Sequence, residues 1–517
     1  MNSRRINSVG DSSTAISTSL PDDDEKDHEV NKDIEKSIVP PEGVPKTPDS
    51  TQPTILTDWD SPKDPDNPQN WTARKKAYHI MVPTILGFVV SLGTSVYPPS
   101  IEGISARFDI SNEVGLIGLM TFVLGLAFGP VLGSPASEAL GRRPVYLITI
   151  PLFGIFTMGA GLAKNIETVI ICRFFAGMFG GPALAVGAGT NADLYPPESR
   201  VFTTSLFTLG PFFATGVGPV IGSYVDSRKG WRWVEWTLIF FILFGLVFSL
   251  FTKETYKKII LKKRAKARGT PLPPGPSGLA FVKHIMTVVG TRPIHMLATE
   301  PIVISFAIYV SFNFAVLFGF LASIPLIFTT VYGFTHAQSG LPFIAIAIGV
   351  IISIPTMSIL DRIFYQKHHR RATQEGRKGI APEYRLYGAM LGSLGLPISL
   401  FWFAWTSQSS VHWIVPIIGL IPFAWGNITV FISCVLYMVD TYMAANSASA
   451  MAANGLLRYI FGAVFPLFTI QMYNGMGFQW ASSLLGFVTL ILLPVPWVLF
   501  VYGKKIRERS GYETWKE

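Results

Sequence analysis

Charged residues and cysteines are scarce in this 517-residue chain. Only 15% of its residues are Asp, Glu, Lys or Arg, whereas soluble globular proteins carry about 25%. Hydrophobic residues make up 49%, and the mean hydropathy is +0.39. The two cysteines, Cys172 and Cys434, both fall in apolar segments, where a small buried side chain is their usual role, so no disulfide framework is expected. This composition excludes a water-soluble globular protein and indicates a membrane protein.

The chain also lacks the motifs of an enzyme or an ATP-driven pump. No Gly-x-x-x-x-Gly-Lys-Ser/Thr phosphate loop occurs in it. His368 and His369 stand in a basic loop beside Arg370 and Arg371, which is typical of a solvated anchor and not of a metal or catalytic centre. We therefore expect no enzyme activity, no metal site and no cofactor.

The net charge of +9 does not indicate a nucleic-acid partner. The Lys and Arg residues lie between long apolar runs and do not form one basic face. No cleavable signal peptide is visible, because residues 1–73 are polar and Pro-rich. That composition, with an acidic cluster at 22–25, predicts a disordered tail.

Twelve apolar runs are long enough to cross a bilayer core of about 30 Å, which needs about 20 residues of helix. The expected spans are Ala77–Tyr97, Val114–Ser134, Val145–Ala163, Val169–Ala188, Thr203–Val225, Val234–Phe251, Ile302–Ile324, Leu341–Leu360, Leu386–Trp405, Trp413–Tyr437, Ala448–Gln471 and Trp480–Tyr502. The fold class is therefore an all-α polytopic membrane protein.

Basic residues gather in the loops on one side of these spans, which the positive-inside rule assigns to the cytoplasm. The opposite loops carry little beyond Arg107, Lys164 and the cluster Arg228, Lys229 and Arg232. The expected organisation is a cytoplasmic tail over 1–73, an N-terminal six-helix bundle over 74–252, a cytoplasmic linker over 253–299, a C-terminal six-helix bundle over 300–503 and a cytoplasmic tail over 504–517.

An internal repeat relates the two halves. In the first half 26 residues separate Asp193 from Pro219, and in the second half 26 residues separate Asp440 from Pro466, with a Tyr two residues after each Asp. Parallel six-helix repeats place a substrate site near the membrane midplane between the halves. Alternating access then follows from rocking of one half against the other.

The first half contains three sequence motifs, which lie between spans two and three, in span four and in span five. The loop between spans two and three contains Gly133, Glu138, Gly141, Arg142 and Arg143, which we expect to act as a cytoplasmic gate: Gly133 allows close helix approach, and Glu138 with the arginines forms a charge latch. Span four carries Arg173 followed by Phe-Phe-Ala-Gly. The glycines and prolines of span five, which would pack and bend that helix, are Gly210, Pro211, Gly218, Pro219 and Gly222.

These motifs resemble the major facilitator superfamily and, within it, the fungal twelve-spanner drug:proton antiporters, over Asp64 to Ser510. Further matches are the segment Asp64 to Trp71, the run Pro382 to Leu386, and Asn454 to Arg458. The resemblance implies the superfamily fold with two pseudo-symmetric six-helix bundles. It also implies antiport for the span-five motif and proton coupling for the span-four arginine. Ala214 and Ser223 depart from the span-five pattern, but both are small.

Proton coupling requires a titratable group in the membrane, for which carboxylates are the usual choice. The acidic residues that touch spans all lie near a span end: Glu113, Asp193, Glu235, Glu300, Asp361 and Asp440. Asp193 resembles a residue of this branch that matters for transport. We therefore expect Arg173 and Asp193 to form the coupling set. The alternatives are that Arg173 snorkels to the interface and that Asp193 pairs with cytoplasmic arginines.

The expected substrate cavity is aromatic with few polar groups, which suits amphipathic or planar molecules. Its residues are Tyr309, Phe312, Asn313, Phe314, Phe318, Phe423, Trp425, Asn427, Asn454 and Arg458. Polyamine export is disfavoured because a polycation needs carboxylates to offset its dehydration. Arg173 and Arg458 leave export of organic acids as the alternative substrate class.

We predict a secondary active transporter that exports small amphipathic molecules such as drugs, toxins or metabolites by proton antiport. The alternatives are an exporter of organic anions such as carboxylates and a passive channel or facilitator. The expected partners are a small-molecule substrate and the lipid bilayer, with no nucleic acid, and the expected state is a monomer. The resemblance implies a fungal plasma membrane, with both termini cytoplasmic, and leaves a vacuolar membrane open.

Overall fold

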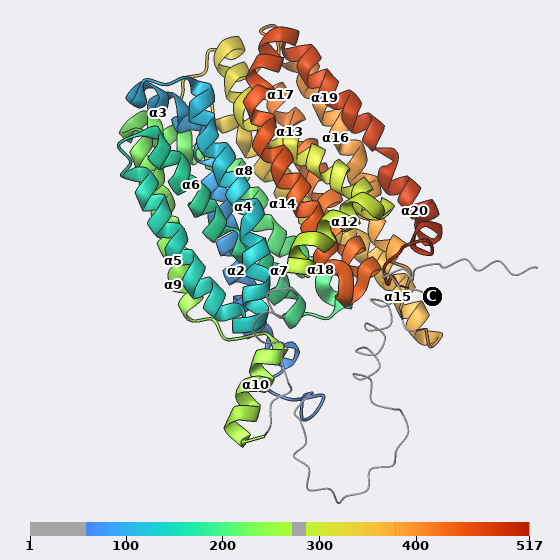
Figure 1. Ribbon diagram of the computed structural model, residues 1–517. Coiled ribbons are helices and arrows are strands. Elements are labelled where there is room, and N and C mark those ends of the chain that lie inside the picture. The colour runs from blue at the N-terminus through green and yellow to red at the C-terminus, as the bar shows by residue number, and fades with distance from the viewer. Residues whose placement is uncertain (1–57, 271–285, 378, 516–517) are drawn as a thin grey trace, which may run out of the picture. The chain divides into compact units, whose positions relative to one another are not determined.

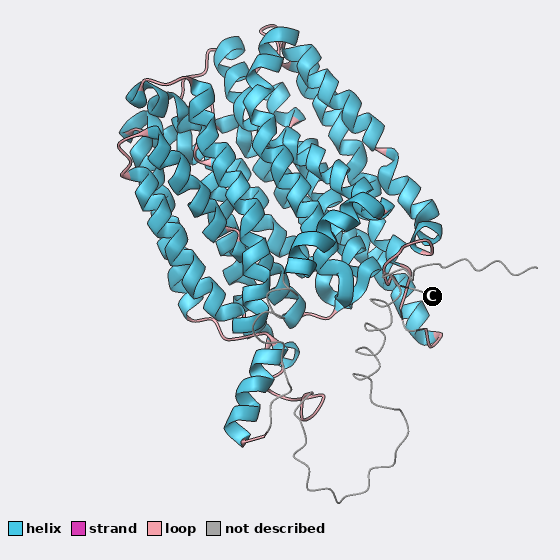
Figure 2. Ribbon diagram, viewed as in Figure 1, coloured by secondary structure: helices cyan, strands magenta, loops and turns pink. Residues whose placement is uncertain are grey.

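The computed structural model describes residues 58–270, 286–377 and 379–515, and all regular elements in those residues are helices (Figures 1 and 2). Twelve of the described helical stretches are long and apolar enough to cross a membrane. The all-α membrane fold expected from the sequence is therefore confirmed. Residues 1–57 of the tail predicted over 1–73, residues 271–285 of the predicted linker and the last two residues of the predicted C-terminal tail lie outside the described residues.

Six spans belong to the first half of the chain, shown from blue to green in Figure 1. They are α2 (Ala73–Ser95) continued by η2 (Pro98–Ser100) and α3 (Ile101–Phe108), α4 (Asn112–Leu140), α5 (Arg142–Gly161), α6 (Ile166–Gly180) with α7 (Pro182–Leu194), η3 (Pro197–Ser199) with α8 (Arg200–Lys229), and α9 (Trp231–Leu250).

The second half repeats this arrangement, shown from yellow to red. Its spans are α13 (Pro301–Tyr332), η5 (Leu341–Phe343) with α14 (Ile344–Leu360), η6 (Asp361–Tyr365) and α15 (Gln366–Gln374), η7 (Pro382–Leu386) with α16 (Tyr387–Thr406), α17 (Ile414–Gly419) with α18 (Ile421–Met476), and α19 (Phe478–Leu492) with α20 (Pro494–Arg507). Helix α18 supplies two spans, because it bends sharply at Met443, whose φ of 51° and ψ of −166° are not helical.

The two halves form two bundles that meet along a seam. Within the first half α2 packs on α8, and α5 packs on α6 and α9; within the second, α18 packs on α13 and α16. Across the seam α8 packs on α14, η5 and α18, and α4 packs on α18. The pseudo-symmetric pair of six-helix bundles is thus confirmed.

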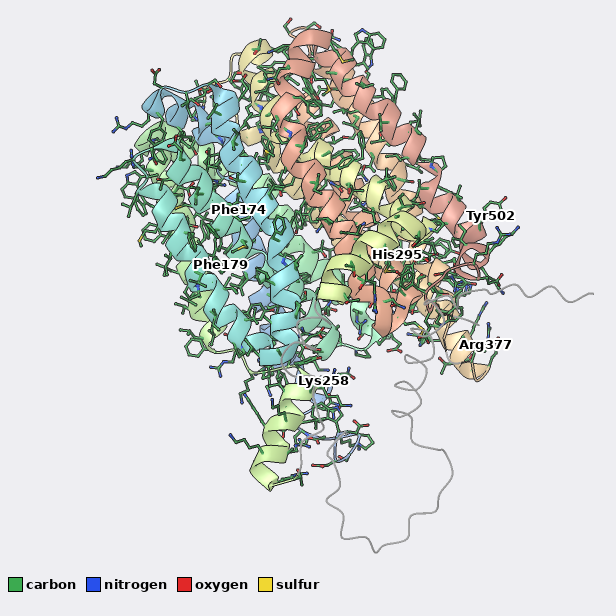
Figure 3. All side chains as sticks on the ribbon, viewed as in Figure 1. Phe174, Phe179, Lys258, His295, Arg377 and Tyr502 are labelled. Carbon is green, nitrogen blue, oxygen red and sulfur yellow. The ribbon has the colours of Figure 1, made fainter. Side chains whose placement is uncertain are left out.

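We call the end of the bundles where α2 begins and α20 ends the basic face, and the other end the opposite face. Helices α10 (Lys257–Arg268) and α15 lie at the basic face, where Lys258 and Arg377 are labelled in Figure 3. Helix α12 (Arg292–Thr299), preceded by η4 (Met286–Thr291), packs against α13 and α18.

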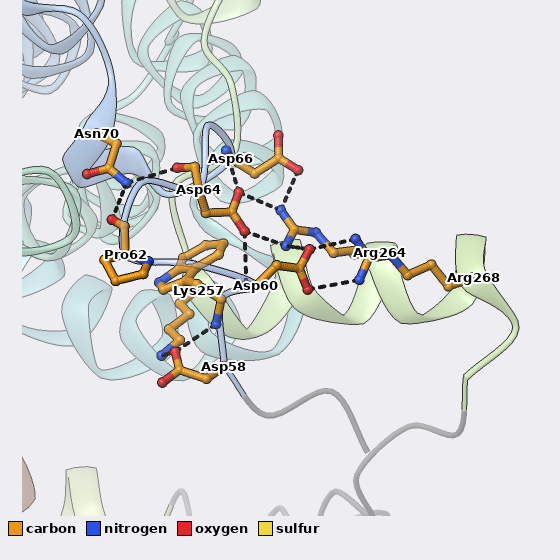
Figure 4. Close-up of polar contacts among 10 residues, drawn as sticks. Asp58, Asp60, Pro62, Asp64, Asp66, Asn70, Lys257, Arg264 and Arg268 are labelled. Atoms are coloured by element: carbon orange, nitrogen blue, oxygen red, sulfur yellow. Dashed lines mark hydrogen bonds and ion pairs between the residues drawn. The ribbon is translucent and has the colours of Figure 1, made fainter. Parts of the chain in front are cut away.

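A cluster of carboxylates fastens the segment before α2 to α10, as Figure 4 shows. Arg264 of α10 donates hydrogen bonds to Asp64 at 2.6 and 2.9 Å, to Asp60 at 3.0 Å and to Asp66 at 2.7 Å. Arg268 also binds Asp60. The Arg264 guanidinium holds the pKa of Asp64 well below its usual range. Residues 58–66 therefore lie against α10, and the short helix η1 (Pro68–Asn70) packs on α7.

Candidate functional site

Arg173 is enclosed in the first bundle with every side of its guanidinium engaged. The side chain is 1% exposed. It donates to the carbonyl oxygens of Gly118 on α4 at 2.9 Å and Gly93 on α2 at 2.6 Å. Its charge also lies over the rings of Tyr97 and Phe122, at 3.8 and 4.8 Å from their centroids. Snorkelling to the interface is therefore wrong for this arginine.

The carboxylate that pairs with Arg173 is Glu235 of α9, at 2.8 Å, and not Asp193. The Glu235 side chain is 4% exposed, so both charges are removed from water. A buried ion pair of this kind is tolerated only when its geometry is good and its remaining hydrogen-bonding groups are satisfied. Arg173 and Asp193, predicted as one coupling set, are thus not in contact. They lie in separate networks.

Asp193 lies at the basic face and pairs with Arg142 at 3.1 Å. Thr255 also donates to Asp193 at 3.1 Å, and Arg142 donates to Ser137 at 2.6 Å. Asp193 thus pairs with an arginine of the basic face, as in the alternative interpretation of this residue. Arg142 lies so close to α7 that a Cβ on Gly189 would come within 2.7 Å of its guanidinium carbon.

The charge latch involves a different acid from the one expected. Glu138 is exposed and forms no ion pair with Arg142 or Arg143 in the structure. Glu254 instead accepts from the backbone N–H groups of Arg142 at 2.9 Å and Arg143 at 3.2 Å, and thereby caps the N-terminus of α5. Gly141, whose φ is +103°, leaves the room for that carboxylate, because a Cβ there would lie 2.3 Å from Glu254 Oε2.

The second half contains an ion pair equivalent to that of Arg142 and Asp193. Arg385 in η7, just before α16, donates to Asp440 of α18 at 2.8 Å, as Arg142 at the start of α5 donates to Asp193 at the end of α7. The sequence spacing that relates Asp193 to Asp440 therefore marks two equivalent sites. Arg385 also binds the carbonyl oxygen of Pro197 at 3.2 Å, which joins the two bundles at the basic face.

The motif glycines of α8 lie where this helix touches its neighbours. A Cβ on Gly210 would lie 2.2 Å from the Thr84 carbonyl oxygen, and one on Gly218 would lie 2.0 Å from Ser95 Oγ. A Cβ on Gly222 would lie 2.4 Å from the Val96 carbonyl oxygen. Two members of the motif touch other glycines: Pro211 packs on Gly87, and the Pro219 carbonyl oxygen faces Gly340 beyond the seam. Close packing of α2 on α8 leaves no room for larger side chains.

The residues expected to line one cavity divide into two groups. Tyr309, Asn313, Phe423, Asn427 and Asn454 are fully buried within the second bundle. Phe423 packs on Phe320, Asn454 approaches Cys434 Sγ at 3.9 Å, and Trp425 donates to Thr356 at 3.1 Å. Phe312 contacts Phe465, and Phe318 stacks on Phe314.

The second group surrounds Arg458 at the seam. The Arg458 guanidinium carbon lies 4.9 Å from the centroid of Phe314 and 4.8 Å from those of Phe431 and Tyr459. Phe212 of α8 reaches this group from the other bundle, with ring centroids 5.9 Å from Phe314 and 5.4 Å from Phe431. We call Arg458 and these four rings the aromatic cluster. It contains side chains of both halves.

Residues 84–466 match the family model of the Major Facilitator Superfamily. This range contains most of the described spans. The chain belongs to the major facilitator superfamily.

The relatives of this transporter show to which branch of the superfamily it belongs. It is 38% identical to Polyamine transporter 4 of Saccharomyces cerevisiae, over 97% of this chain and 78% of the relative. It is 36% identical to MFS-type transporter traF of Penicillium crustosum, over 88% and 93% of the two chains, and 34% identical to a multidrug transporter of Candida glabrata, over 93% and 84%. These relatives place it in the fungal drug:proton antiporter branch, and its family is one of transporters, not enzymes.

Among solved structures, the transporter resembles the proton:xylose symporter XylE with a TM-score of 0.61. The match covers 84% of this chain and 96% of that one at 16% identity, so it supports the fold alone.

The two halves of the transporter also contact each other at the opposite face. Asp226 near the end of α8 pairs with His336, in the loop after α13, at 3.0 Å. Beside it a Cβ on Gly340 would lie 2.4 Å from the Pro219 carbonyl oxygen and 2.7 Å from Ser223 Oγ. The bundles are thus in contact at both faces in this structure, through Arg385 at one and His336 at the other.

Proposed function

We propose that this transporter exports small amphipathic molecules in exchange for protons, by rocking of its two bundles about the seam. The superfamily and the polyamine-transporter and multidrug-transporter relatives support transport in general. The basic face is the cytoplasmic one under the positive-inside rule, so both termini lie in the cytoplasm of a cell bounded by the proposed plasma membrane.

The observation that carries the proton-coupling proposal is the buried pair of Arg173 and Glu235. A carboxylate inside a bundle is expensive to keep charged without its partner, so protonation of Glu235 and release of Arg173 are linked events. The carbonyl oxygens of Gly93 and Gly118 hold the guanidinium between α2 and α4. Breaking the pair therefore changes how α9 is tied to both helices.

The two basic-face pairs, Arg142 with Asp193 and Arg385 with Asp440, serve as the cytoplasmic gate in this proposal. Arg385 supports this role because it contacts Pro197 of the other bundle. The Glu254 cap on α5 holds the Arg142 backbone in place while its side chain changes partners. Asp193 thus acts in gating, and Glu235 takes the coupling role first expected of Asp193.

The test uses purified transporter in proteoliposomes with an imposed proton gradient and a fluorescent amphipathic dye. Wild type is expected to move the dye uphill with saturable kinetics, which distinguishes it from a passive channel. Glu235→Gln is expected to keep dye exchange at zero gradient and to lose the uphill phase. Glu167→Gln, at an exposed acid of α6, is the matched control. An unchanged uphill phase in Glu235→Gln would remove this carboxylate from coupling.

A further inference from the structure

Arg458, which is half-buried in a membrane span, differs from four other enclosed arginines because no carboxylate pairs with it. Arg173, Arg142, Arg385 and Arg507 each pair with an acid at 2.8–3.1 Å. Arg458 forms no ion pair with any residue that the structure describes, and its Nε is enclosed without a hydrogen-bond partner. A cation inside a membrane span without a counter-charge is costly, and a ligand can supply that charge.

The carboxylates of the spans are not free to serve a cationic ligand instead. Six enclosed carboxylates are already bound within their own bundle, and the pairs are Asp193 with Arg142, Glu235 with Arg173, Glu300 with Tyr442, Asp361 with Gln366, Glu383 with Arg507 and Asp440 with Arg385. The charge left uncompensated at the seam is therefore positive.

The surroundings of Arg458 give the shape of the ligand. Phe314, Phe431 and Tyr459 flank the guanidinium, and Phe212 approaches from the other bundle. Flat aromatic faces favour a planar apolar body, whereas a guanidinium binds carboxylate or sulfonate oxygens with two parallel hydrogen bonds. Because side chains of both halves take part, a ligand here contacts both bundles.

We propose that the aromatic cluster is a substrate position for planar amphipathic monoanions, with Arg458 as the anion ligand. This inference rests on the proposed export function and specifies its substrate class. It also predicts that this transporter disfavours polycations, whereas its relative in Saccharomyces cerevisiae is named a polyamine transporter. In the second bundle, Asn313 Nδ2 and Oδ1 and Asn427 Nδ2 are also buried without hydrogen-bond partners.

The experiment compares three probes that share a naphthalene ring: the sulfonate, the neutral sulfonamide and the methylammonium derivative. Binding to full-length detergent-purified transporter is measured by calorimetry, and uptake is measured in proteoliposomes. Wild type is expected to bind the sulfonate about tenfold or more tightly than the other two, the difference of one good charged contact. Arg458→Gln is expected to abolish this preference, and Arg458→Lys to keep part of it.

Phe431→Leu is the matched control, because it removes a ring and keeps the charge. It is expected to weaken all three probes alike. Equal binding of the three probes by wild type, or an anion preference that survives in Arg458→Gln with an unchanged melting temperature, would overturn the inference. Transport of the cation without the sulfonate would overturn it while leaving export intact. Sulfonate uptake that ignores the proton gradient would leave the inference standing and contradict proton antiport.

Discussion

At the scale of single residues, buried charges decide most of the chemistry of this transporter. Arg173 and Glu235 neutralise each other in the first bundle, Arg142 and Asp193 do so at the basic face, and Arg458 has no counterpart. The distinction between a compensated and an uncompensated arginine separates residues that hold or switch the fold from a residue that can receive a ligand.

The Arg173–Glu235 pair lets stability and coupling be separated. Arg173→Leu alone leaves a buried carboxylate unpaired and is expected to destabilise the protein by about 3–5 kcal/mol. The double variant Arg173→Leu with Glu235→Leu replaces the pair by apolar groups, so its melting temperature is expected to return close to that of wild type. Gradient-driven uptake should stay absent in both. Uphill transport by the stable double variant would be inconsistent with a coupling role.

Substitution of Asp193 should affect export in the same way as substitution of Asp440, its counterpart in the second half. Asp193→Asn weakens the hydrogen bond from Arg142, which is worth about 1.5–3 kcal/mol for a charged group. We expect it to favour opening of the basic face and to lower export while surface expression is kept. Asp440→Asn is the matched control and should lower export to a similar degree. Export that falls in only one of the two would show that these sites are not equivalent in mechanism.

At the scale of elements, α8 is a helix that packs against helices of both bundles. Its glycines touch α2, whereas Gly216 lies so near α14 that a Cβ there would come within 2.6 Å of the Ala347 nitrogen. A helix held on two sides by backbone contacts transmits a shift of one bundle to the other, because close-packed interiors deform little.

Gly218→Leu tests that packing. Its Cβ alone would lie 2.0 Å from Ser95 Oγ and 3.0 Å from the Ser95 carbonyl carbon, so α2 and α8 must separate. Overpacking of this kind costs about 1–3 kcal/mol, and substrate exchange is expected to be blocked at normal expression. Gly455→Leu on α18 is the control, because a Cβ there meets nothing within 4 Å. Normal exchange by Gly218→Leu would show that the tight contact is not needed.

At the scale of the whole molecule, the Asp226–His336 pair connects the bundles at the opposite face. The hydrogen bond to Asp226 raises the pKa of His336 above its ordinary value of 6.5, burial opposes this, and Glu102 adds to the rise. A raised pKa means that the contact is fully present below the ordinary value and is lost as pH rises through the raised one.

Opening at the opposite face should therefore become faster as the pH on that side rises. Asp226→Asn is expected to remove this dependence, and His412→Gln, at an exposed histidine of the same face, should keep it. The measurement is the rate of substrate exchange against pH on that side of the membrane. A pH profile of Asp226→Asn identical to that of wild type would contradict a role for this pair.

The sequence by itself determined the features that depend on composition and periodicity. Span number follows from the length of apolar runs, because a bilayer of fixed thickness requires about 20 residues of helix. The repeat was visible in the spacing of Asp193, Pro219 and their counterparts, and the motif between spans two and three marked the family.

Only the tertiary structure decided which charges meet. The place of Glu235 near the end of its span does not indicate a partner for Arg173, yet Arg173 lies near the same membrane face in α6, and packing of the first bundle brings the two together. Glu254, and not Glu138, binds at Arg142, because the chain after α9 returns to the start of α5. Ion pairs between distant segments depend on helix rotation and depth, which a linear pattern of residues does not specify.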